Sequence, residues 1–162
     1  QSVIFALKYG GRADIADTLG EIMFDYMLAE YTADELSAMY DIVIPVPIHS
    51  DKLKKRGFNH AELIGSSFAG RAGLRFDPGA LLRTRDTVPM KGLGPEERRA
   101  NIHGAFEIRN SRLPFIQGAR ILLIDDIFTT GSTIDEIASL LKRCGAERVD
   151  FIAFAAAGDM VI

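Results

Sequence analysis

The spacing of apolar residues along the chain predicts helices that alternate with short strands. Apolar positions recur at helical spacing over residues 14–31, which predicts an amphipathic helix. The runs at residues 41–46 and 120–124 are short, apolar and rich in β-branched residues, which is typical of buried parallel strands. The same patterns predict further helices over residues 2–9, 59–72 (capped by Asn59 and stopped by Gly73), 95–101 and 133–144, and strands over residues 80–83, 105–108 and 148–155.

This order of elements predicts the fold class. Strands that alternate with helices of about 10–15 residues favour an α/β fold, with a parallel sheet flanked by helices. The interval 80–117 breaks the alternation, so we expect an edge hairpin there with a flexible loop over residues 85–94. We expect a single domain over residues 1–162, with a small N-terminal helical hood or flank at 1–40 and the core at 41–157.

The composition narrows the classes of function. The 162 residues are 48% hydrophobic and 25% charged, which is typical of a soluble globular domain. A net charge of −3 argues against strong nucleic-acid binding through bulk charge, although it leaves a local basic patch open. A single cysteine forms neither an internal disulfide nor a CxxC zinc pair, so we expect a reducing, cytoplasmic setting. No apolar run approaches the ~20 residues that cross a membrane, and the absence of an initial Met suggests a piece of a longer protein.

The segment ILLIDDIFTTGST, residues 121–133, carries the strongest chemical signal. Its apolar run delivers Asp125 and Asp126 to the carboxyl end of a buried strand, and a Thr/Gly/Ser turn leads into the next helix. Backbone N–H groups at such a helix start can hold a phosphate, and the two carboxylates can accept hydrogen bonds from hydroxyls beside it. A phosphate next to a diol describes a ribose 5-phosphate.

Structural roles would also explain parts of this segment. For the acid pair alone, a capping Asp beside a salt-bridged Asp is the more common arrangement at a strand-to-helix turn. For the turn alone, Ser132 or Thr133 could simply cap the next helix, but one cap needs only one of the four hydroxyls. Gly131 would let the backbone approach an anion closely. The segment matches neither the Walker P-loop nor the GxGxxG dinucleotide fingerprint.

Residues 47–57, which follow the first core strand, are interpreted as a polar, basic loop. Ligands of an open parallel sheet lie beyond the carboxyl ends of its strands, so this loop would face the same crevice as the acids. Its cations Lys52, Lys54, Lys55 and Arg56 could neutralise a diphosphate there. The alternative is a solvated surface loop whose charges serve solubility.

A second loop, residues 84–101, holds Lys91 and Arg98 among Gly and Pro residues. A lid that excludes water from a reactive intermediate and a plain surface hairpin are equally compatible with this pattern. The three histidines lack metal-ligand spacing and are interpreted as loop or helix-surface residues, with His49 nearest the basic loop: His49, His60 and His103.

Residues 121–133 resemble the signature of type I phosphoribosyltransferases, which bind 5-phosphoribosyl 1-diphosphate (PRPP). The resemblance implies that Asp125 and Asp126 hold the ribose 2- and 3-hydroxyls and are catalytic together with Lys55 and Arg56. It implies Mg²⁺ that is held largely by substrate oxygens, with the acid pair nearby. The other implied ligands are Thr129, Thr130, Gly131, Ser132 and Thr133 for the 5-phosphate, Lys52, Lys54, Lys55, Arg56 and Gly57 for the diphosphate, and Lys91 and Arg98 in the flexible loop.

The wider chain is similar to one branch of that family, the ComF-type competence proteins. Three further segments carry this similarity: LKYGGRADIADTLGEIM, PVPIHSDKLKKRGFNHAELI and PMKGLGPEERRANIHGAF. Members of the branch commonly carry a cysteine-rich, zinc-ribbon-like front end that this chain lacks, so we expect no zinc in it. The branch often has Gln where Met90 stands, and its members are often labelled amidophosphoribosyltransferase-like. No N-terminal cysteine nucleophile supports that specific reaction here.

The resemblance implies a type I phosphoribosyltransferase fold and transfer of the phosphoribosyl group from PRPP to a nitrogen nucleophile, with release of diphosphate. The alternative is a non-catalytic PRPP- or nucleotide-binding accessory protein of DNA uptake. The implied partners are PRPP and a nitrogenous acceptor or nucleotide, without a membrane, and a homodimer is an open alternative. Single-stranded DNA and the competence machinery enter by family analogy only.

Overall fold

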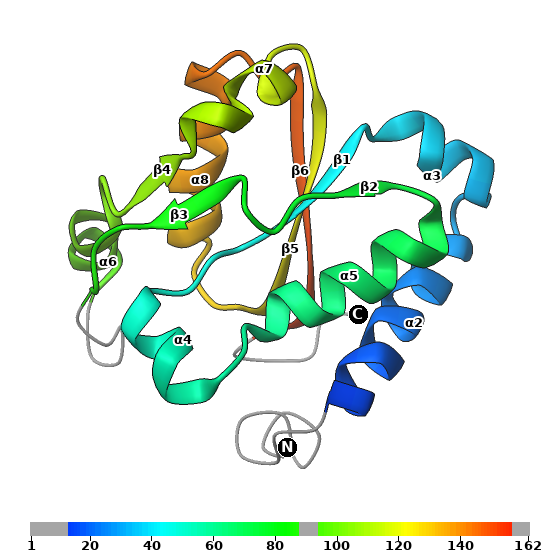
Figure 1. The fold of residues 1–162 in the computed structure, drawn as a ribbon, viewed down its shortest axis with the longest axis horizontal. Helices are drawn as coiled ribbons and strands as arrows, with labels where there is room; N and C mark the ends of the chain where they lie inside the picture. Colours follow the sequence, from blue (N-terminus) through cyan, green and yellow to red (C-terminus); the bar gives the residue numbers. More distant parts are fainter. Residues whose placement is uncertain (1–12, 88–93, 157–162) are drawn as a thin grey trace.

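The computed structural model describes residues 13–87 and 94–156, and the helix predicted over residues 2–9 lies outside them. Strands and helices alternate along most of the described chain (Figure 1). In chain order the elements are α2 (Ala13–Leu28), α3 (Ala33–Met39), β1 (Ile42–Pro45), α4 (Ser50–Arg56), α5 (His60–Ala72), β2 (Arg75–Phe76), β3 (Leu81–Arg83), α6 (Pro95–Ile102), β4 (Phe106–Ile108), the 3-10 turn η1 (Asn110–Arg112), α7 (Leu113–Ile116), β5 (Arg120–Phe128), α8 (Ser132–Arg143) and β6 (Arg148–Ala156).

Four parallel strands form the main sheet, in the order β2-β1-β5-β6. The two central strands pair in register from Ile42 opposite Ile121 to Pro45 opposite Ile124, so their carboxyl ends lie together. Strands β3 and β4 form a separate antiparallel pair, with Leu81 opposite Ile108. The expected parallel sheet, flanking helices and edge hairpin are therefore confirmed.

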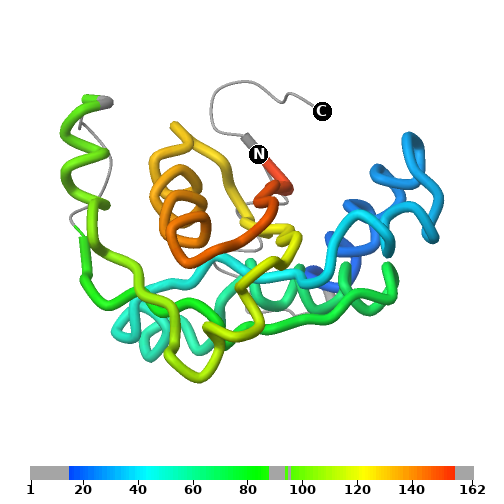
Figure 2. Tube along the Cα trace, turned by 90° about the horizontal axis from the view of Figure 1, so that it is seen from above, coloured from blue at the N-terminus to red at the C-terminus, as the bar shows by residue number. Residues whose placement is uncertain are grey.

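Helices cover both faces of the sheet. Successive side chains of β1 and β5 point to opposite faces, so each strand contributes apolar residues to both cores. Ile121 and Leu123 of β5 belong to the apolar core that α8 and the β3–β4 hairpin cover. Leu122 and Ile124 belong to the core beneath α5 and α2. Figure 2 shows α8 on one side of the strands and α2 and α5 on the other. The N-terminal helix α2 is thus a flank of the sheet.

The segment 47–57 is a helix for most of its length, so its prediction as a loop was wrong. The ring nitrogen Nδ1 of His49 accepts a hydrogen bond from the backbone N–H of Asp51 and caps the start of α4. Gly57 ends α4 in the left-handed region at φ 84°, with its N–H bonded to the carbonyl of Leu53. These local caps stabilise about two turns of helix that have no buried residue of their own.

Strand β5 continues past the predicted end at Ile124. It pairs with β6 as far as Phe128 opposite Ala156, so the last part of β5 is held from one side only. Asp125 and Asp126 therefore lie inside the strand, four and three residues from the turn at Thr129. The sequence analysis also missed four short elements: α3, β2, η1 and α7.

A hydrogen-bonded cluster closes the sheet at the amino ends of its strands. The hydroxyl of Tyr40, which is 5% exposed, donates to the Asp150 carboxylate over 2.9 Å. The Asp150 carboxylate also pairs with Arg148, with 2.6 Å between Nε and Oδ2. Burial and the Asp150 carboxylate together raise the pKa of Tyr40 to about 12. The hydroxyl therefore stays a hydrogen-bond donor throughout the neutral pH range.

Among residues 13–87 and 94–156, no helix combines the length and the apolar character that a membrane crossing requires.

Tyr40→Phe should lower the free energy of unfolding by about 1 kcal/mol, because it removes this partly buried hydrogen bond while Asp150 keeps its arginine partner. Urea denaturation followed by circular dichroism measures the change. Tyr26→Phe is the matched control, since Tyr26 is 50% exposed on α2 and its hydroxyl loss should change stability by less than about 0.5 kcal/mol. Equal effects of the two substitutions would show that the Tyr40 hydrogen bond is not stabilising.

Candidate functional site

The acid pair lies on β5 just beyond the point where its pairing with β1 ends and only its pairing with β6 continues. Beyond Ile124 strand β1 no longer pairs with β5, so Asp125 and Asp126 stand next to an open edge and both are partly exposed. The carboxylate of Asp125 accepts the backbone N–H of Asp126 over 2.8 Å. The backbone itself therefore holds Asp125 in place.

A buried histidine holds the second acid. The ring nitrogen Nδ1 of His60 lies 3.5 Å from Oδ2 of Asp126, and the His60 side chain is 4% exposed. The ring of Phe58 packs edge-on against the imidazole, with 4.9 Å between the ring centroids. The interpretation of His60 as a surface residue was therefore wrong, because the first turn of α5 turns it inward to β5.

The start of α5 is fastened to the end of β1 by Asn59, which is 7% exposed. Its side-chain amide donates to the carbonyl of Val46 over 2.9 Å, and its side-chain oxygen accepts the N–H of Ala61. The predicted role of Asn59 as a helix cap is confirmed, and Gly73 ends the helix as expected. This one side chain fixes the helix start that carries His60.

The two carboxylates have opposite protonation tendencies. Burial, reinforced by the charge of Asp126, raises the pKa of Asp125 to about 8. Burial acts in the same direction on Asp126 and is the largest single effect there, but the hydrogen bonds from His60 and Asp125 and the charge of His60 together outweigh it, so the pKa of Asp126 lies below its ordinary value. At neutral pH the pair therefore carries close to one negative charge, localised on Asp126.

The turn after β5 leads into α8 without a side-chain cap. Gly131 occupies the cap position at φ 80°, in the left-handed region, and contributes no side chain to the helix start. The hydroxyls of Thr130 and Ser132 lie 3.2 Å apart and interact with each other. Capping by Ser132 or Thr133 therefore does not account for this turn, and the first N–H groups of α8 remain available to an anion.

The aromatic ring of Phe128 lies next to Gly131 in this turn. A β-carbon on Gly131 would lie 3.4 Å from the ring of Phe128, which is a tight contact. The Phe128 ring stacks on Phe151 of β6 with 5.2 Å between centroids and 19° between planes. Glycine at position 131 therefore fits beside the Phe128 ring and adopts the positive φ of the turn without strain.

The basic residues predicted around residue 52 lie on α4, which follows β1 at the same edge of the sheet as the acids. Lys52 pairs with Asp86 over 3.3 Å, and Lys54 lies 3.9 Å from Asp51. Lys55 and Arg56 are exposed and form no ion pair with any residue that the structure describes. Gly57 ends the helix directly after them. Lys55 and Arg56 are therefore the cations of α4 that are available to a ligand.

Of the predicted lid, Lys91 lies outside the described residues. Arg98 is partly buried in α6, and its Nε is buried with no hydrogen-bond partner in the described part of the chain. Arg85 ties the start of the segment to its end by donating to the carbonyls of Asn101 and His103 over 3.1 and 2.6 Å. Arg85 thus links the two described ends of this segment, and its role as a lid stays a prediction.

Arg83 is a charged residue that the sequence analysis did not select. Burial at the end of β3 lowers the pKa of its guanidinium, while the carboxylates of Asp86 and Asp125 partly offset that effect. The Arg83 side chain also donates to the hydroxyl of Thr87. Arg83, at the end of β3, therefore brings a positive charge close enough to interact electrostatically with Asp125.

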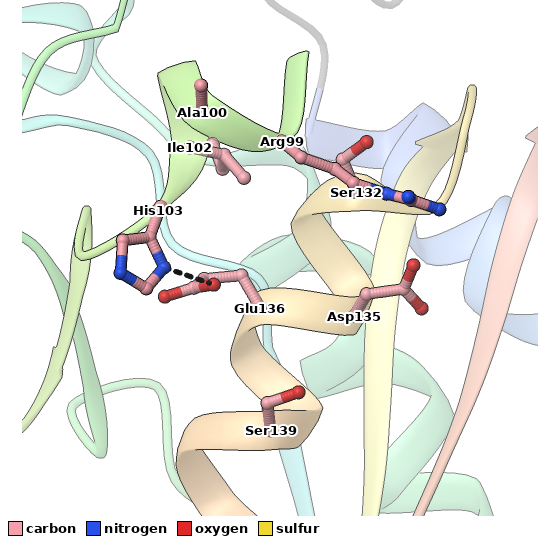
Figure 3. A pocket seen from close by; sticks show the side chains of 8 residues that line it. All are labelled: Arg99, Ala100, Ile102, His103, Ser132, Asp135, Glu136 and Ser139. Carbon is pink, nitrogen blue, oxygen red and sulfur yellow. Dashed lines mark hydrogen bonds and ion pairs between the residues drawn. The ribbon is translucent and has the colours of Figure 1, made fainter. Parts of the chain in front are cut away.

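A cavity of about 500 Å³ adjoins the turn on the side of α6 (Figure 3). Glu136 bridges the two helices across it, because its carboxylate accepts the N–H of Gly104 over 2.9 Å and lies 3.4 Å from Nδ1 of His103. Neither acid of the pair lines this cavity. Its lining residues are Arg99, Ala100, Ile102, His103, Ser132, Asp135, Glu136 and Ser139.

The structure thus brings together the acid pair, the turn at residues 129–133 and α4 at one edge of the sheet. Sequence reasoning missed His60 and Arg83. The apolar stretch after Asn59 marked a helix that faces the core, so His60 at its first position could have been recognised as inward-facing. Arg83 carried no comparable signal, because its partners come from a different strand and a loop.

The chain is similar in sequence to known proteins. The family model described as Phosphoribosyl transferase domain matches residues 65–160. The DNA utilization protein YhgH of Salmonella typhimurium is 33% identical over 147 residues, which are 91% of this chain and 63% of that protein. Competence protein F of Haemophilus influenzae is 32% identical over 109 residues, which are 67% of this chain and 47% of that protein. The chain therefore spans less than two thirds of these relatives.

Solved structures share the fold at low sequence identity. The glutamine PRPP amidotransferase from B. subtilis, solved with ADP and GMP, superposes with a TM-score of 0.53 at 20% identity over 86% of this chain and 26% of that chain. The adenine phosphoribosyltransferase from Thermoanaerobacter pseudethanolicus gives a TM-score of 0.53 at 19% identity over 89% of this chain and 69% of that one. These likenesses confirm the predicted fold class.

Asp125→Asn should raise the melting temperature at pH 8 by about 3 °C or more and change it less at pH 5. Between about pH 4 and pH 8 folded Asp125 retains a proton that the unfolded chain has released, so wild-type stability falls as the pH rises through this range. Asparagine is neutral at every pH and removes this penalty. Thermal unfolding at the two pH values measures the difference.

Asp126→Asn is the matched control and should have the opposite effect. The pKa of Asp126 is lowered in the fold, so its ionised form stabilises the protein above about pH 4, and that contribution is lost with the charge. A melting temperature below that of the wild type for Asp126→Asn at pH 8 would support the different surroundings of Asp125 and Asp126. Equal shifts for both variants would contradict the assignment of the charge to Asp126.

Proposed function

The chain belongs to the phosphoribosyltransferase domain family, and on that basis we propose that it binds PRPP and transfers its phosphoribosyl group to a nitrogen nucleophile. The observation that supports this proposal most strongly is the acid pair followed by the turn that begins at Thr129 and by a helix start at Gly131 and Ser132 without a side-chain cap. The carboxylates accept hydrogen bonds from the ribose 2- and 3-hydroxyls. The N–H groups at residues 131–133 and the hydroxyls of Thr129, Thr130, Ser132 and Thr133 receive the 5-phosphate.

The cations of α4 complete the binding of PRPP. The 1-diphosphate carries about three negative charges, and Lys55 and Arg56 have no competing ion pair among the described residues. Lys52 and Lys54 add positive potential from the same helix, although both have carboxylate neighbours. The site thus holds the substrate at three points along its length, which aligns C1 for displacement.

In the proposed reaction, a nitrogen lone pair forms the C1–N bond while the C1–O bond to the diphosphate breaks. Diphosphate leaves with the bonding electrons, and positive charge develops on the ribose ring. The ionised Asp126 carboxylate stabilises this charge, and the cations of α4 stabilise the leaving group. No step requires a covalent bond between protein and sugar.

The donor set also suits a magnesium ion that is carried by the substrate. The described residues include no group of three or more His, Cys, Asp and Glu side chains that could hold a metal by themselves. Two carboxylates next to a diphosphate are the usual surroundings of Mg²⁺, which keeps most of its coordination in water and phosphate oxygens. Mg²⁺ would neutralise the diphosphate, with Asp125 and Asp126 close by.

The names of the relatives favour a second function. Because they are called a DNA utilization protein and a competence protein, a non-catalytic module that binds PRPP or a nucleotide in DNA uptake is the alternative. Calorimetry with PRPP and Mg²⁺ tests binding, and diphosphate release with purines, pyrimidines, ammonia and nicotinate tests turnover. Binding together with release supports the transferase, whereas binding without release for any acceptor supports the module.

The double variant Asp125→Asn with Asp126→Asn should weaken PRPP binding at least about 100-fold, because it removes the charge-assisted hydrogen bond to Asp126, which contributes about 1.5–3 kcal/mol, together with the carboxyl group of Asp125. Calorimetry with Mg²⁺ measures the affinity, and circular dichroism verifies the fold. Glu30→Gln, an exposed substitution beyond the end of α2, is the control that should bind as wild type does. Unchanged affinity of the double variant would refute the proposed ribose site.

Lys55→Ala with Arg56→Ala should weaken PRPP binding about tenfold or more and leave ribose 5-phosphate binding within about twofold, because only PRPP carries the diphosphate. Titration of both ligands by calorimetry gives the two ratios. Arg143→Ala removes an exposed cation from the far end of α8 and should alter neither affinity. Equal losses for both ligands would place these side chains elsewhere than at the diphosphate.

A further inference from the structure

We propose that His60 is a positioning residue for the ribose site, which orients the Asp126 carboxylate through a hydrogen bond from its Nδ1. This inference rests on the proposed function, because that function makes Asp126 a ligand of the ribose hydroxyls. Its first support is contact. Nδ1 lies 3.5 Å from Oδ2 of Asp126, and the imidazole, at 4% exposure, is almost completely removed from solvent.

The second support is that the imidazole is itself fixed in place. Phe58 packs edge-on against it at an interplanar angle of 77°. The side chain of Asn59, the preceding residue, makes two hydrogen bonds: it donates to the carbonyl of Val46, directly after β1, and accepts from the N–H of Ala61 in the first turn of α5. His60 therefore cannot move without disturbing the junction of β1 and α5, so it can act as a rigid donor.

The third support is that His60 holds the Asp126 carboxylate from a different element, α5. The other groups that interact with this carboxyl group, the Asp125 side chain and the Ile127 backbone, belong to β5 itself. Asp125 needs no such partner, since the backbone N–H of Asp126 already holds its carboxylate. Without His60, the Asp126 carboxylate would lose this donor and could rotate more freely about its χ2 angle, which would weaken its hydrogen bond to a ligand hydroxyl.

Because Nδ1 of His60 is the ring nitrogen that contacts Asp126, substitutions can test whether this nitrogen is the hydrogen-bond donor. The side-chain nitrogen of Asn lies close to the position of Nδ1 in His, whereas the nitrogen of Gln lies close to that of Nε2. Leu approximates the volume of the ring and has no donor. His60→Asn should therefore preserve the contact with Asp126, and His60→Leu and His60→Gln should lose it.

The experiment measures PRPP affinity with Mg²⁺ by calorimetry for the wild type and the three variants. We expect a loss of about tenfold or more for His60→Leu and His60→Gln, and of less than about threefold for His60→Asn. Inorganic phosphate, titrated by NMR against the amide signals of residues 131–133, should bind all four proteins equally. This second probe separates a local effect on Asp126 from a general distortion of the site.

Two results would overturn the inference: wild-type PRPP affinity in His60→Leu and His60→Gln, or equal losses in all three variants, which would indicate packing alone. If His60→Leu does not fold, the comparison of Gln with Asn decides. If the wild type binds no PRPP, the proposed function fails separately. The ¹³C shift of the Asp126 carboxyl carbon in the free protein then tests His60, because it should change in Leu and Gln and be retained in Asn.

Discussion

The arrangement of this site depends on the repulsion between two neighbouring carboxylates that are partly removed from water. Like charges so close cannot both be ionised without strong compensation. The structure resolves the conflict by giving the acids unequal surroundings: Asp125 is held by backbone and favours its protonated form, while Asp126 faces a buried imidazole and favours its ionised form. Pairs of carboxyl groups that are separated in this way can take different roles toward one ligand.

Several long-range contacts assemble the surroundings of the acid pair. Asn59 joins β1 to α5 and thereby brings His60 to Asp126, two residues that are 66 positions apart in the chain. Arg83 extends the positive potential from the hairpin, and Lys52 joins α4 to the segment after β3 through Asp86. The site is therefore assembled where three separate connections of the sheet meet, at the edge where open α/β sheets bind ligands.

The anion-binding turn follows a different principle, because it relies on backbone rather than on side-chain charge. Gly131 permits the φ value and the close contact with Phe128, and the helix start that follows lacks a side-chain cap. A terminus in this condition is favourable for a phosphate and slightly unfavourable when empty. The acid pair and the turn thus both carry a free-energy cost in the absence of a ligand, which is common at functional sites.

The amino-acid sequence determined the order of strands and helices, the caps Asn59 and Gly73 and the identity of the acid–turn segment, because these depend on periodicity and on residues adjacent in the chain. It could not show that α4 is a helix, since about two turns without a buried face leave no periodic signal. Nor could it show that β5 continues beyond Ile124, which depends on pairing with β6. Only the tertiary structure decided the contacts of His60 and Arg83, because hydrogen bonds and electric fields act between residues that folding alone brings together.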